Sequence, residues 1–464
     1  MIRLTLGELA TLVDGRLAGA AADRTVTAPV TVDSREVTPG GLFAAYAGEH
    51  ADGHDFAAAA VDAGAVAVLG TRAVEGAPTV VVADVTAALG SLARALLDRL
   101  PDLTVVGITG SAGKTTTKDL VAQVLGRLGP VIAPPGSFNN EIGLPLTVLR
   151  ADETTRHLVL EYSARGVGHI RYLTGIAPPR VAAVLNVGSA HLGEFGSREA
   201  IAEAKGELVE ALPADGVAVL SADDPLVAGM ATRTRAPVTT FGEAATADVR
   251  ADAVELDALA RPRFRLHVDG DSADVALQLS GRHMVANALA TAAVARRCGM
   301  PLGDAAQALS AARPASRWRM EVSDRPDGVT VINDAYNANP ESARAAVDAL
   351  VAIAGESRRS WAVLGLMAEL GEAAAEAHRA VGDHAARAGV DRVVAVGQEA
   401  AGIRTGAGPA AVLVDDVAAA VRLLRRELRP GDVVLVKASR AAGLERIAAA
   451  LLADADDGAR EAAS

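Results

Sequence analysis

The sequence is poor in cysteine and in long hydrophobic runs. It contains a single cysteine, Cys298, among 464 residues, so no intramolecular disulfide and no cysteine-based metal cluster can form. No run approaches 18 consecutive apolar residues, which excludes a membrane-spanning helix. The first 15 residues lack the basic start and apolar stretch of a signal peptide. We therefore expect a cytoplasmic protein with no membrane insertion.

Aromatic residues and positive charge are also scarce. Aromatic residues make up 3% of the chain, and the formal net charge is -12 at pH 7. A negative net charge argues against binding to nucleic acid or to anionic lipid. Any phosphate group must therefore be bound in a local pocket of backbone amides and a few lysine or arginine side chains.

The chain is longer than one hydrophobic core usually organises. Residues 1–100 contain short apolar segments separated by turns, whereas residues 101–314 and 315–464 alternate apolar segments with helical ones. Residues 246–279 interrupt this rhythm with short alternating strands that predict a hairpin region. Strands that alternate with helices predict parallel sheets. We predict an α/β protein of three domains, with the bounds 1–100, 101–314 and 315–464.

A glycine-rich segment follows the apolar strand Thr104–Thr109 and opens a helix, as a phosphate-binding loop requires. Its glycines let backbone amides converge on phosphate oxygens. We expect Lys114 to neutralise the β- and γ-phosphates and the Thr115 hydroxyl to help hold Mg²⁺. The alternative is a glycine-rich turn with a surface lysine, because Ile108 occupies the first glycine position of the commoner motif. The predicted ATP contacts are Gly110, Ser111, Ala112, Gly113, Lys114, Thr115 and Thr116.

Several motifs spread along the chain resemble those of one family. The short loop motif Gly110–Thr115 resembles the form used by the Mur ligases and the folylpolyglutamate synthases. Four further segments are similar to Mur ligase segments, with Ala438 in place of a glycine: Asp33–Arg35, Ser137–Leu146, Asp334–Pro340 and Lys437–Arg440. The resemblance to the Mur ligase family therefore covers the whole chain. It implies an N-terminal domain that binds a UDP-linked substrate, a central phosphate-loop ATPase domain, and a C-terminal Rossmann-like domain that binds the amine substrate and closes over ATP.

The resemblance also implies the reaction. Asp334–Pro340 is similar to the segment of those family members that add D-alanyl-D-alanine to UDP-N-acetylmuramoyl-tripeptide. The implied activity is an ADP-forming amide ligase that works through an acyl phosphate and makes the UDP-N-acetylmuramoyl-pentapeptide precursor of peptidoglycan. It implies ATP and two Mg²⁺ ions as cofactors, a monomer, and a role in cell-wall biogenesis, cell shape and cell division.

A magnesium site is expected near the phosphate loop. Glu161 ends the apolar strand His157–Glu161, and Mg²⁺ prefers hard oxygen ligands, so Glu161 and Thr115 make a plausible first site. The resemblance adds His191 and Lys205, and it implies that Lys205 carries a carbamate. The alternatives are a solvated glutamate, a loop histidine and a surface lysine. The segment after Glu161 departs from the family pattern at Tyr162–Ala164.

Further contacts follow from the remaining motifs. The segment Gly281–Ala290 resembles the family helix that meets adenine, and an amide side chain can pair with the edge of adenine, which suits Asn287. The alternative is a buried asparagine at the start of a helix. The resemblance assigns Arg319 to the γ-phosphate, although Arg317 is close enough to be confused with it. Asp334 ends a predicted strand and would accept hydrogen bonds from the ribose hydroxyls; the alternative is a helix cap. The predicted catalytic residues are Lys114, Lys205, His191, Glu161 and Arg319.

Substrate contacts are predicted at two places. Ser34 and Arg35 follow a short strand and would grip the uridine diphosphate through a hydroxyl and a cation; the alternative is a surface turn. The remaining substrate residues are taken from the family motifs: Asn139, Asn140, Tyr336, Asn337 and Asn339.

Lys118, one turn into the phosphate-loop helix, is predicted to be a surface charge.

The motifs oppose three other assignments. The family member that adds the third peptide residue carries an Asp-Asn-Pro-Arg element that is absent here. A folylpolyglutamate synthase would lack the N-terminal domain with Asp33–Arg35. A catalytically silent scaffold is opposed by the intact set of Lys114, Glu161, His191 and Lys205.

Overall fold

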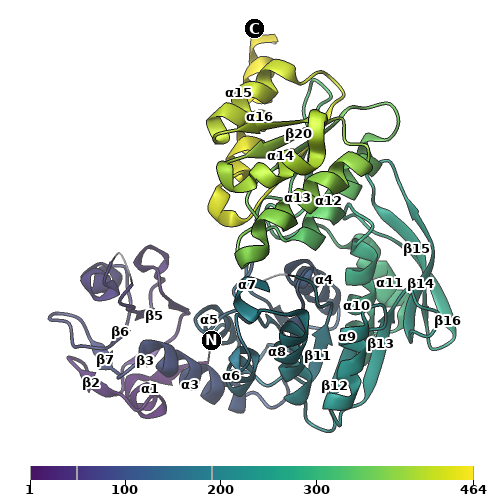
Figure 1. Cartoon of the computed structure of the whole chain (residues 1–464). Coiled ribbons are helices and arrows are strands. Elements are labelled where there is room, and N and C mark those ends of the chain that lie inside the picture. Colours follow the sequence, from purple (N-terminus) through teal and green to yellow (C-terminus); the bar gives the residue numbers. More distant parts are fainter. Residues whose placement is uncertain (1, 49–50, 190–191, 463–464) are drawn as a thin grey trace.

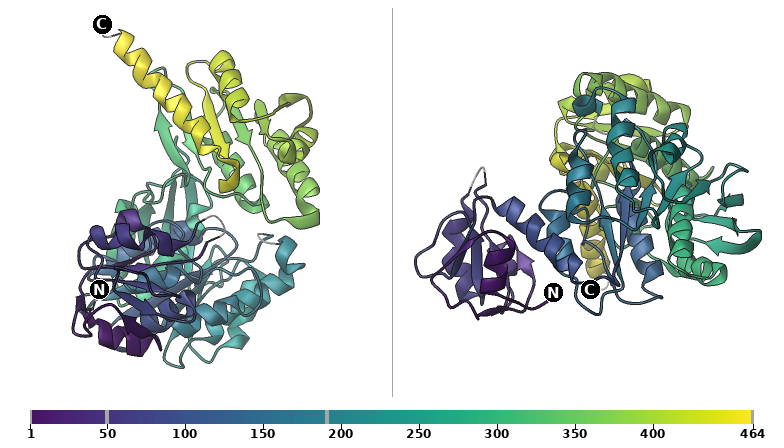
Figure 2. Two further views of the ribbon diagram at one scale, coloured as in Figure 1. Left: turned by 90° about the vertical axis from the view of Figure 1, so that its left-hand side faces the viewer. Right: turned by 90° about the horizontal axis from the view of Figure 1, so that it is seen from below.

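The computed structural model describes residues 2–48, 51–189 and 192–462, with side chains up to Ala453. Three sheet-based bodies form a corner: the N-terminal body lies beside the central one, and the C-terminal body lies above it (Figures 1 and 2). None of the helices in the described ranges is both long and apolar enough to cross a bilayer. The α/β class and the three-domain architecture predicted from the sequence are confirmed.

The N-terminal body is a five-stranded sheet with the order β2-β7-β6-β5-β4. Only β2 is antiparallel to its neighbour. The first and third strands, β1 (Leu4–Thr5) and β3 (Thr25–Val26), pair separately. The strands of the main sheet are β2 (Arg16–Ala18), β4 (Val30–Thr31), β5 (Leu42–Ala44), β6 (Ala67–Gly70) and β7 (Thr79–Val81). The helices are α1 (Leu6–Leu12), α2 (Ala57–Asp62) and α3 (Val85–Asp98).

Helix α3 leads from the N-terminal body to the central one (Figure 1). It begins where the Asp84 side chain accepts a hydrogen bond from the Ala87 amide at 3.0 Å, a standard N-cap. Its apolar side joins a hydrophobic core that includes Leu89 and Leu92 together with Leu144 and Ile170 of the central body. The first two bodies therefore share a continuous apolar contact.

The central body is a nine-stranded sheet with the order β16-β15-β14-β13-β12-β11-β8-β10-β9. The strands from β9 to β14 run parallel, whereas β15 and β16 are antiparallel, which confirms the predicted hairpin region. The strands are β8 (Thr104–Thr109), β9 (Val131–Ile132), β10 (His157–Glu161), β11 (Val181–Val184), β12 (Val217–Ser221), β13 (Val238–Gly242), β14 (Val249–Leu256), β15 (Pro262–Val268) and β16 (Asp271–Ala276). The helices are α4 (Lys114–Leu125), α5 (Gly143–Val148), α6 (His169–Ile176), α7 (Leu192–Phe195), α8 (Arg198–Glu210), α9 (Pro225–Ala228), α10 (Met284–Arg297) and α11 (Leu302–Ala311).

Alternation along β8 separates two layers of helices. Val106 and Ile108 join one core with the apolar residues of α4 and α10, whereas Val105 joins the other core with α5, α6 and α8. This is the period of two that a strand buried on both faces requires. The carboxyl ends of β8 and β10 lie side by side, because Glu161 is in register with Ile108.

The C-terminal body is a six-stranded sheet with the order β17-β18-β22-β19-β20-β21, parallel except at β17. Its strands are β17 (Glu321–Asp324), β18 (Thr330–Asn333), β19 (Ser360–Leu364), β20 (Arg392–Val396), β21 (Ala411–Val414) and β22 (Val433–Lys437). Its helices are α12 (Pro340–Ala354), α13 (Ala374–Arg387), α14 (Ala401–Ala407), α15 (Val417–Glu427) and α16 (Glu445–Ala462). The segment after β18 reaches the central body, where the Asn339 Nδ2 atom donates to the Ser111 carbonyl at 3.2 Å.

Candidate active site

The phosphate loop connects β8 to α4 and has the geometry of an anion cradle. Gly113 has a φ of 83° and is the N-cap of α4, and a Cβ atom there would lie 2.5 Å from Asn287 Oδ1, so only glycine fits. The Ala112 amide donates to Asn186 Oδ1 at 2.9 Å. Lys114 Nζ donates to the Gly110 carbonyl at 2.6 Å, and burial lowers the pKa of this lysine while Glu161 partly offsets the shift. The helix N-terminus and this lysine together suit phosphate.

Glu161 provides a buried carboxylate beside the loop. Its Oε2 atom accepts long hydrogen bonds from Thr115 Oγ1 (3.3 Å), Ser137 Oγ (3.3 Å) and Asn139 Nδ2 (3.4 Å). Its Oε1 atom is buried and has no hydrogen-bond partner. Leaving a buried carboxylate oxygen without a partner costs free energy. Mg²⁺ is commonly bound by a protein carboxylate and further oxygen ligands together with the phosphates of a substrate. The residues present therefore fit magnesium.

No cluster of three or more His, Cys, Asp or Glu that could hold a metal occurs within residues 2–48, 51–189 and 192–462. The oxygens that these residues offer to a metal beside the loop are those of Thr115 and Glu161, and Mg²⁺ is usually bound by one or two carboxylates together with substrate phosphates. His191, the predicted histidine ligand, lies outside the described residues.

Lys205 lies on α8 and is 4% exposed. Burial lowers the pKa of this lysine well below its usual value, and the charge of Lys114 lowers it further. No carboxylate pairs with Lys205 in the described part of the chain. A lowered pKa favours the neutral amine, which is the form that reacts with carbon dioxide, so the environment of Lys205 fits the predicted carbamate.

Arg319 reaches the phosphate loop from the start of the C-terminal body. Its Nη2 atom lies 3.2 Å from Thr115 Oγ1, and its guanidinium carbon lies 4.3 Å from the centre of the Tyr336 ring. Its Nε atom is buried without a hydrogen-bond partner. Arg317, the neighbour that the sequence could not separate from it, is exposed. The structure therefore brings Arg319, and not Arg317, to Thr115.

Asn287 and Asp334 flank the same space. Asn287 is 6% exposed and packs its side chain against the loop at Gly113. Asp334 accepts from the Met320 amide at 3.1 Å and forms a buried ion pair with Lys437 at 2.5 Å. Both carboxylate oxygens of Asp334 thus already have a protein donor, although each oxygen has a second lone pair for a ribose hydroxyl.

A single cavity of about 1280 Å³ connects these groups, and it opens between the central and C-terminal bodies. Gly110, Glu161 and Lys205 lie behind its surface rather than on it. The predicted residues that line it are Ser111, Ala112, Gly113, Lys114, Thr115, Thr116, Asn139, Asn140, Asn287, Arg319, Asp334, Tyr336, Asn337 and Asn339.

Ser34 and Arg35 do not reach this cavity. They lie in the N-terminal body, where the exposed Arg35 guanidinium pairs with Asp33 at 2.6 Å. Hydrogen bonding to Arg35 lowers the pKa of Asp33 to about 2. The pair uses the Nε and Nη2 atoms of Arg35, so the exposed guanidinium keeps further N–H groups for a diphosphate.

The prediction for Lys118 is wrong. This lysine is 1% exposed, its Nζ atom donates to the Pro134 carbonyl at 2.7 Å and to the Gly136 carbonyl at 3.2 Å, and it pairs with Asp119. It ties α4 to the segment that precedes Ser137. The helical position alone suggested a surface charge, and no local signal predicts a partner sixteen residues away.

The sequence reasoning also missed Glu341 as a contact between the two bodies. Its carboxylate accepts from the Ser189 amide at 3.1 Å and from the Ser189 hydroxyl at 3.0 Å. Glu341 follows the Asp334–Pro340 motif directly, so adjacency to that motif was the available signal. Together with Arg319 and Asn339, it closes the C-terminal body onto the phosphate loop.

Comparison with protein families matches most of the chain, in three parts. Residues 28–108 match the model described as Mur ligase family, catalytic domain, residues 108–295 match the Mur ligase middle domain, and residues 318–440 match the Mur ligase glutamate ligase domain.

Individual proteins agree with the family models. The chain is 52% identical to the UDP-N-acetylmuramoyl-tripeptide--D-alanyl-D-alanine ligase of Mycobacterium tuberculosis, over 98% of each chain. It is 37% identical to the enzyme of that name in Escherichia coli, over 97% of this chain and 99% of the other. A crystal structure of MurF from Acinetobacter baumannii superposes with a TM-score of 0.88 at 31% identity, covering 97% of this chain and 99% of the other. MurF from Thermotoga maritima in complex with ADP gives a TM-score of 0.81 at 32% identity, covering 93% and 99%.

Proposed function

The chain belongs to the Mur ligase family, and on this premise we propose that it is the ATP-dependent ligase that joins D-alanyl-D-alanine to UDP-N-acetylmuramoyl-tripeptide. One observation carries the proposal: Lys114 and Thr115 of the phosphate loop meet Arg319 of the C-terminal body at the cavity between the two bodies. A γ-phosphoryl group in the loop would thus lie between a lysine and an arginine from different domains. The product would be the UDP-linked pentapeptide precursor of peptidoglycan.

In the first step, an oxygen of the tripeptide's terminal carboxylate attacks the γ-phosphorus of ATP. The bond to the β-γ bridging oxygen breaks, ADP leaves, and an acyl phosphate forms. Lys114 and Arg319 oppose the negative charge that spreads over the γ-phosphoryl oxygens, which is the main catalytic contribution a protein makes to phosphoryl transfer. We place Asn139 and Asn140 on the tripeptide side of the cavity.

Magnesium would be held by Thr115 and Glu161, with His191 and a carbamylated Lys205 as the further ligands of a two-ion site. When bound, Mg²⁺ neutralises charge on the phosphate oxygens and orients them. The unpartnered Oε1 atom of Glu161 and the low pKa of the buried Lys205 amine support this assignment.

In the second step, the free amine of D-alanyl-D-alanine attacks the acyl carbonyl carbon. The amine loses a proton, and the tetrahedral intermediate expels inorganic phosphate to leave an amide. We place the dipeptide beside Tyr336, Asn337 and Asn339, which line the cavity from the C-terminal body. The contacts of Arg319 and Glu341 hold that body over the loop, and such closure keeps water from the acyl phosphate.

The nucleotide is assigned to the loop with its adenine at Asn287 and its ribose at Asp334, and the uridine diphosphate to Ser34 and Arg35. We propose the domain bounds 1–100, 101–314 and 315–464, which are supported by the separate sheets of the three bodies. The enzyme is proposed to act as a monomer in the cytoplasm, where ATP and UDP-linked precursors are present.

The test is phosphate release by the purified protein with ATP, magnesium and UDP-N-acetylmuramoyl-tripeptide. D-alanyl-D-alanine is compared with D-glutamate and with diaminopimelate as the amine donor. We expect release only when the dipeptide and the UDP-linked tripeptide are both present, and we expect Lys114→Ala to lose ATP binding. Turnover with another amine, or ATP binding unchanged in Lys114→Ala, would refute the assignment.

A further inference from the structure

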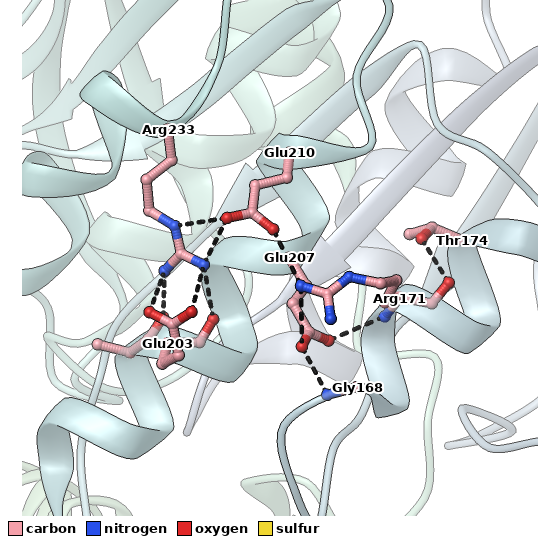
Figure 3. A network of polar contacts seen from close by, with 8 residues as sticks. Gly168, Arg171, Thr174, Glu203, Glu207, Glu210 and Arg233 are labelled. Atoms are coloured by element: carbon pink, nitrogen blue, oxygen red, sulfur yellow. Dashed lines mark hydrogen bonds and ion pairs between the residues drawn. The ribbon is translucent and has the colours of Figure 1, made fainter.

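A polar network covers one side of helix α8, the helix that carries Lys205 (Figure 3). At about 100° per residue, Glu203, Glu207 and Glu210 lie roughly 160°, 200° and 140° around the helix from Lys205. The network therefore lies on the face opposite to the lysine. None of its members belongs to the cavity wall.

Glu207 is the buried centre of this network. Its side chain is 0% exposed, and its carboxylate accepts from the Gly168 amide at 2.5 Å and from the Arg171 amide at 2.9 Å. Gly168 is the N-cap of α6, so a glutamate on α8 satisfies the free amides at the start of a different helix. A carboxylate is buried at high cost unless it is paired in this way, and this bond therefore fixes α6 against α8.

The segment tied down by Glu207 leads directly back to Glu161. It runs from the end of β10 through Ser163, Ala164 and Arg165, which line the cavity, to Gly168. Of the two groups assigned to the magnesium site from this part of the fold, Lys205 lies on α8 with Glu207, and Glu161 ends β10, the strand that this segment leaves.

Arg233 fixes α8 from the other side of the network (Figure 3). It ends the short 3-10 helix η3 (Gly229–Arg233), and its guanidinium pairs with Glu210 at 2.8 Å and with Glu203 at 3.3 Å. The guanidinium lies directly against Gly206, where an added Cβ atom would be 2.0 Å from Nη1. A glycine inside a helix is normally unfavourable, and here it makes room for the arginine.

We propose that Glu207 and Arg233 are positioning residues for the ligase reaction, which together set the rotation of α8 and the course of the Ser163–Gly168 loop, and thereby the separation of Lys205 and Glu161. This inference rests on the proposed function, because it assumes that both groups serve the metal site. The two residues touch neither substrate nor metal. They act through the helix and the loop that they hold.

The test compares wild type with Glu207→Gln and Gly206→Ala. The glutamine keeps the volume of the side chain but turns an amide NH₂ toward one of the backbone amides that it must accept from. The alanine expels the Arg233 guanidinium and is itself the better helix former, so it leaves the helix intact. Arg180→Ala is the matched control, because it removes an exposed ion pair with Asp215 in the same body that is not part of this network.

Two quantities are measured for each protein: kcat for phosphate release, and the affinity for Mn²⁺ in the presence of a non-hydrolysable ATP analogue, followed by electron paramagnetic resonance. Loss of a residue that orients metal ligands typically costs about 10- to 100-fold in metal affinity or activity. We expect a loss of that size in both quantities for Glu207→Gln and Gly206→Ala, with the KM for D-alanyl-D-alanine within about twofold of wild type. Arg180→Ala should match wild type.

The outcomes separate the two proposals. If wild type performs the ligation but both variants keep its kcat and its Mn²⁺ affinity, the positioning role is refuted and the proposed function stands. If wild type itself does not ligate, the proposed function fails. Should Glu207→Gln not fold, as judged by its circular dichroism melt, Gly206→Ala decides alone.

Discussion

The contact between Arg319 and the phosphate loop allows a sharp test of the site. We predict that Arg319→Ala lowers kcat by about a thousandfold, whereas Arg317→Ala leaves it unchanged. Arg319 Nη2 lies 3.2 Å from Thr115 Oγ1 across the gap between the two bodies. Arg317, two residues earlier in the same segment, is exposed. The two variants remove the same charge from nearly the same place in the sequence, so their difference isolates the position of the guanidinium.

The magnitude follows from Coulomb's law. A unit charge about 4 Å from a developing charge, at an effective dielectric constant of about 20, contributes about 4 kcal/mol. Since about 1.4 kcal/mol corresponds to a factor of ten in rate, this equals about three orders of magnitude. Arg319→Ala also removes the cation–π contact with Tyr336, which stabilises the position of that ring by about 1 kcal/mol.

The assay is initial-rate phosphate release at saturating ATP, dipeptide and UDP-linked tripeptide. Arg319→Lys should fall between wild type and alanine, because it keeps the charge but loses the planar fork. A circular dichroism melt checks that each variant is folded. An Arg319→Ala enzyme within about tenfold of wild type, or an equal loss in Arg317→Ala, would refute the reasoning.

Three further predictions concern other parts of the fold. Gly113→Ala should weaken ATP binding in calorimetry by at least about tenfold, since its Cβ atom would lie 2.5 Å from Asn287 Oδ1 at a φ of 83°; unchanged affinity would contradict the cradle. Lys205→Met, in bicarbonate-free buffer, should be inactive yet melt at a higher temperature than wild type at pH 7. Burial holds the pKa of Lys205 well below 10.5, so the buried lysine destabilises the fold, and this destabilisation shrinks only as the pH rises toward 10.5. A lower melting temperature of the variant at pH 7 would count against the prediction. Trp361→Phe should lower the free energy of unfolding in urea by about 1–2 kcal/mol with kcat unchanged, because the indole donates to the buried Asp432 carboxylate at 3.1 Å; an unaltered unfolding midpoint would argue that the bond contributes nothing.

Much of the fold was predictable because its signals are local. The predicted strands Thr104–Thr109 and His157–Glu161 have these bounds in the structure, since each is a short apolar run between turn residues. The phosphate loop was equally predictable, because its parts are neighbours in the chain: a strand, a glycine-rich turn and a lysine at the start of a helix. The hairpin region after residue 246 was predicted as a change of period, and it extends the edge of the central sheet.

Contacts between distant residues were not predictable in this way. The sequence placed Lys118 on the surface because nothing near it indicates a partner, yet it is buried by carbonyls of a neighbouring segment. No neighbour in the sequence indicates that Glu207 caps another helix 39 residues away. Glu341 likewise finds its partner, Ser189, 152 residues away, in the other body.

The sequence by itself therefore determined the chemistry that is available: a phosphate loop, a carboxylate at a strand end, and a helix lysine given by family resemblance. Only the tertiary structure decided which charges meet, such as Arg319 rather than Arg317 at Thr115. The physical reason is that backbone hydrogen bonding and side-chain periodicity are fixed by near neighbours along the chain. The pairing of charges on separate domains depends instead on how the finished bodies pack against each other.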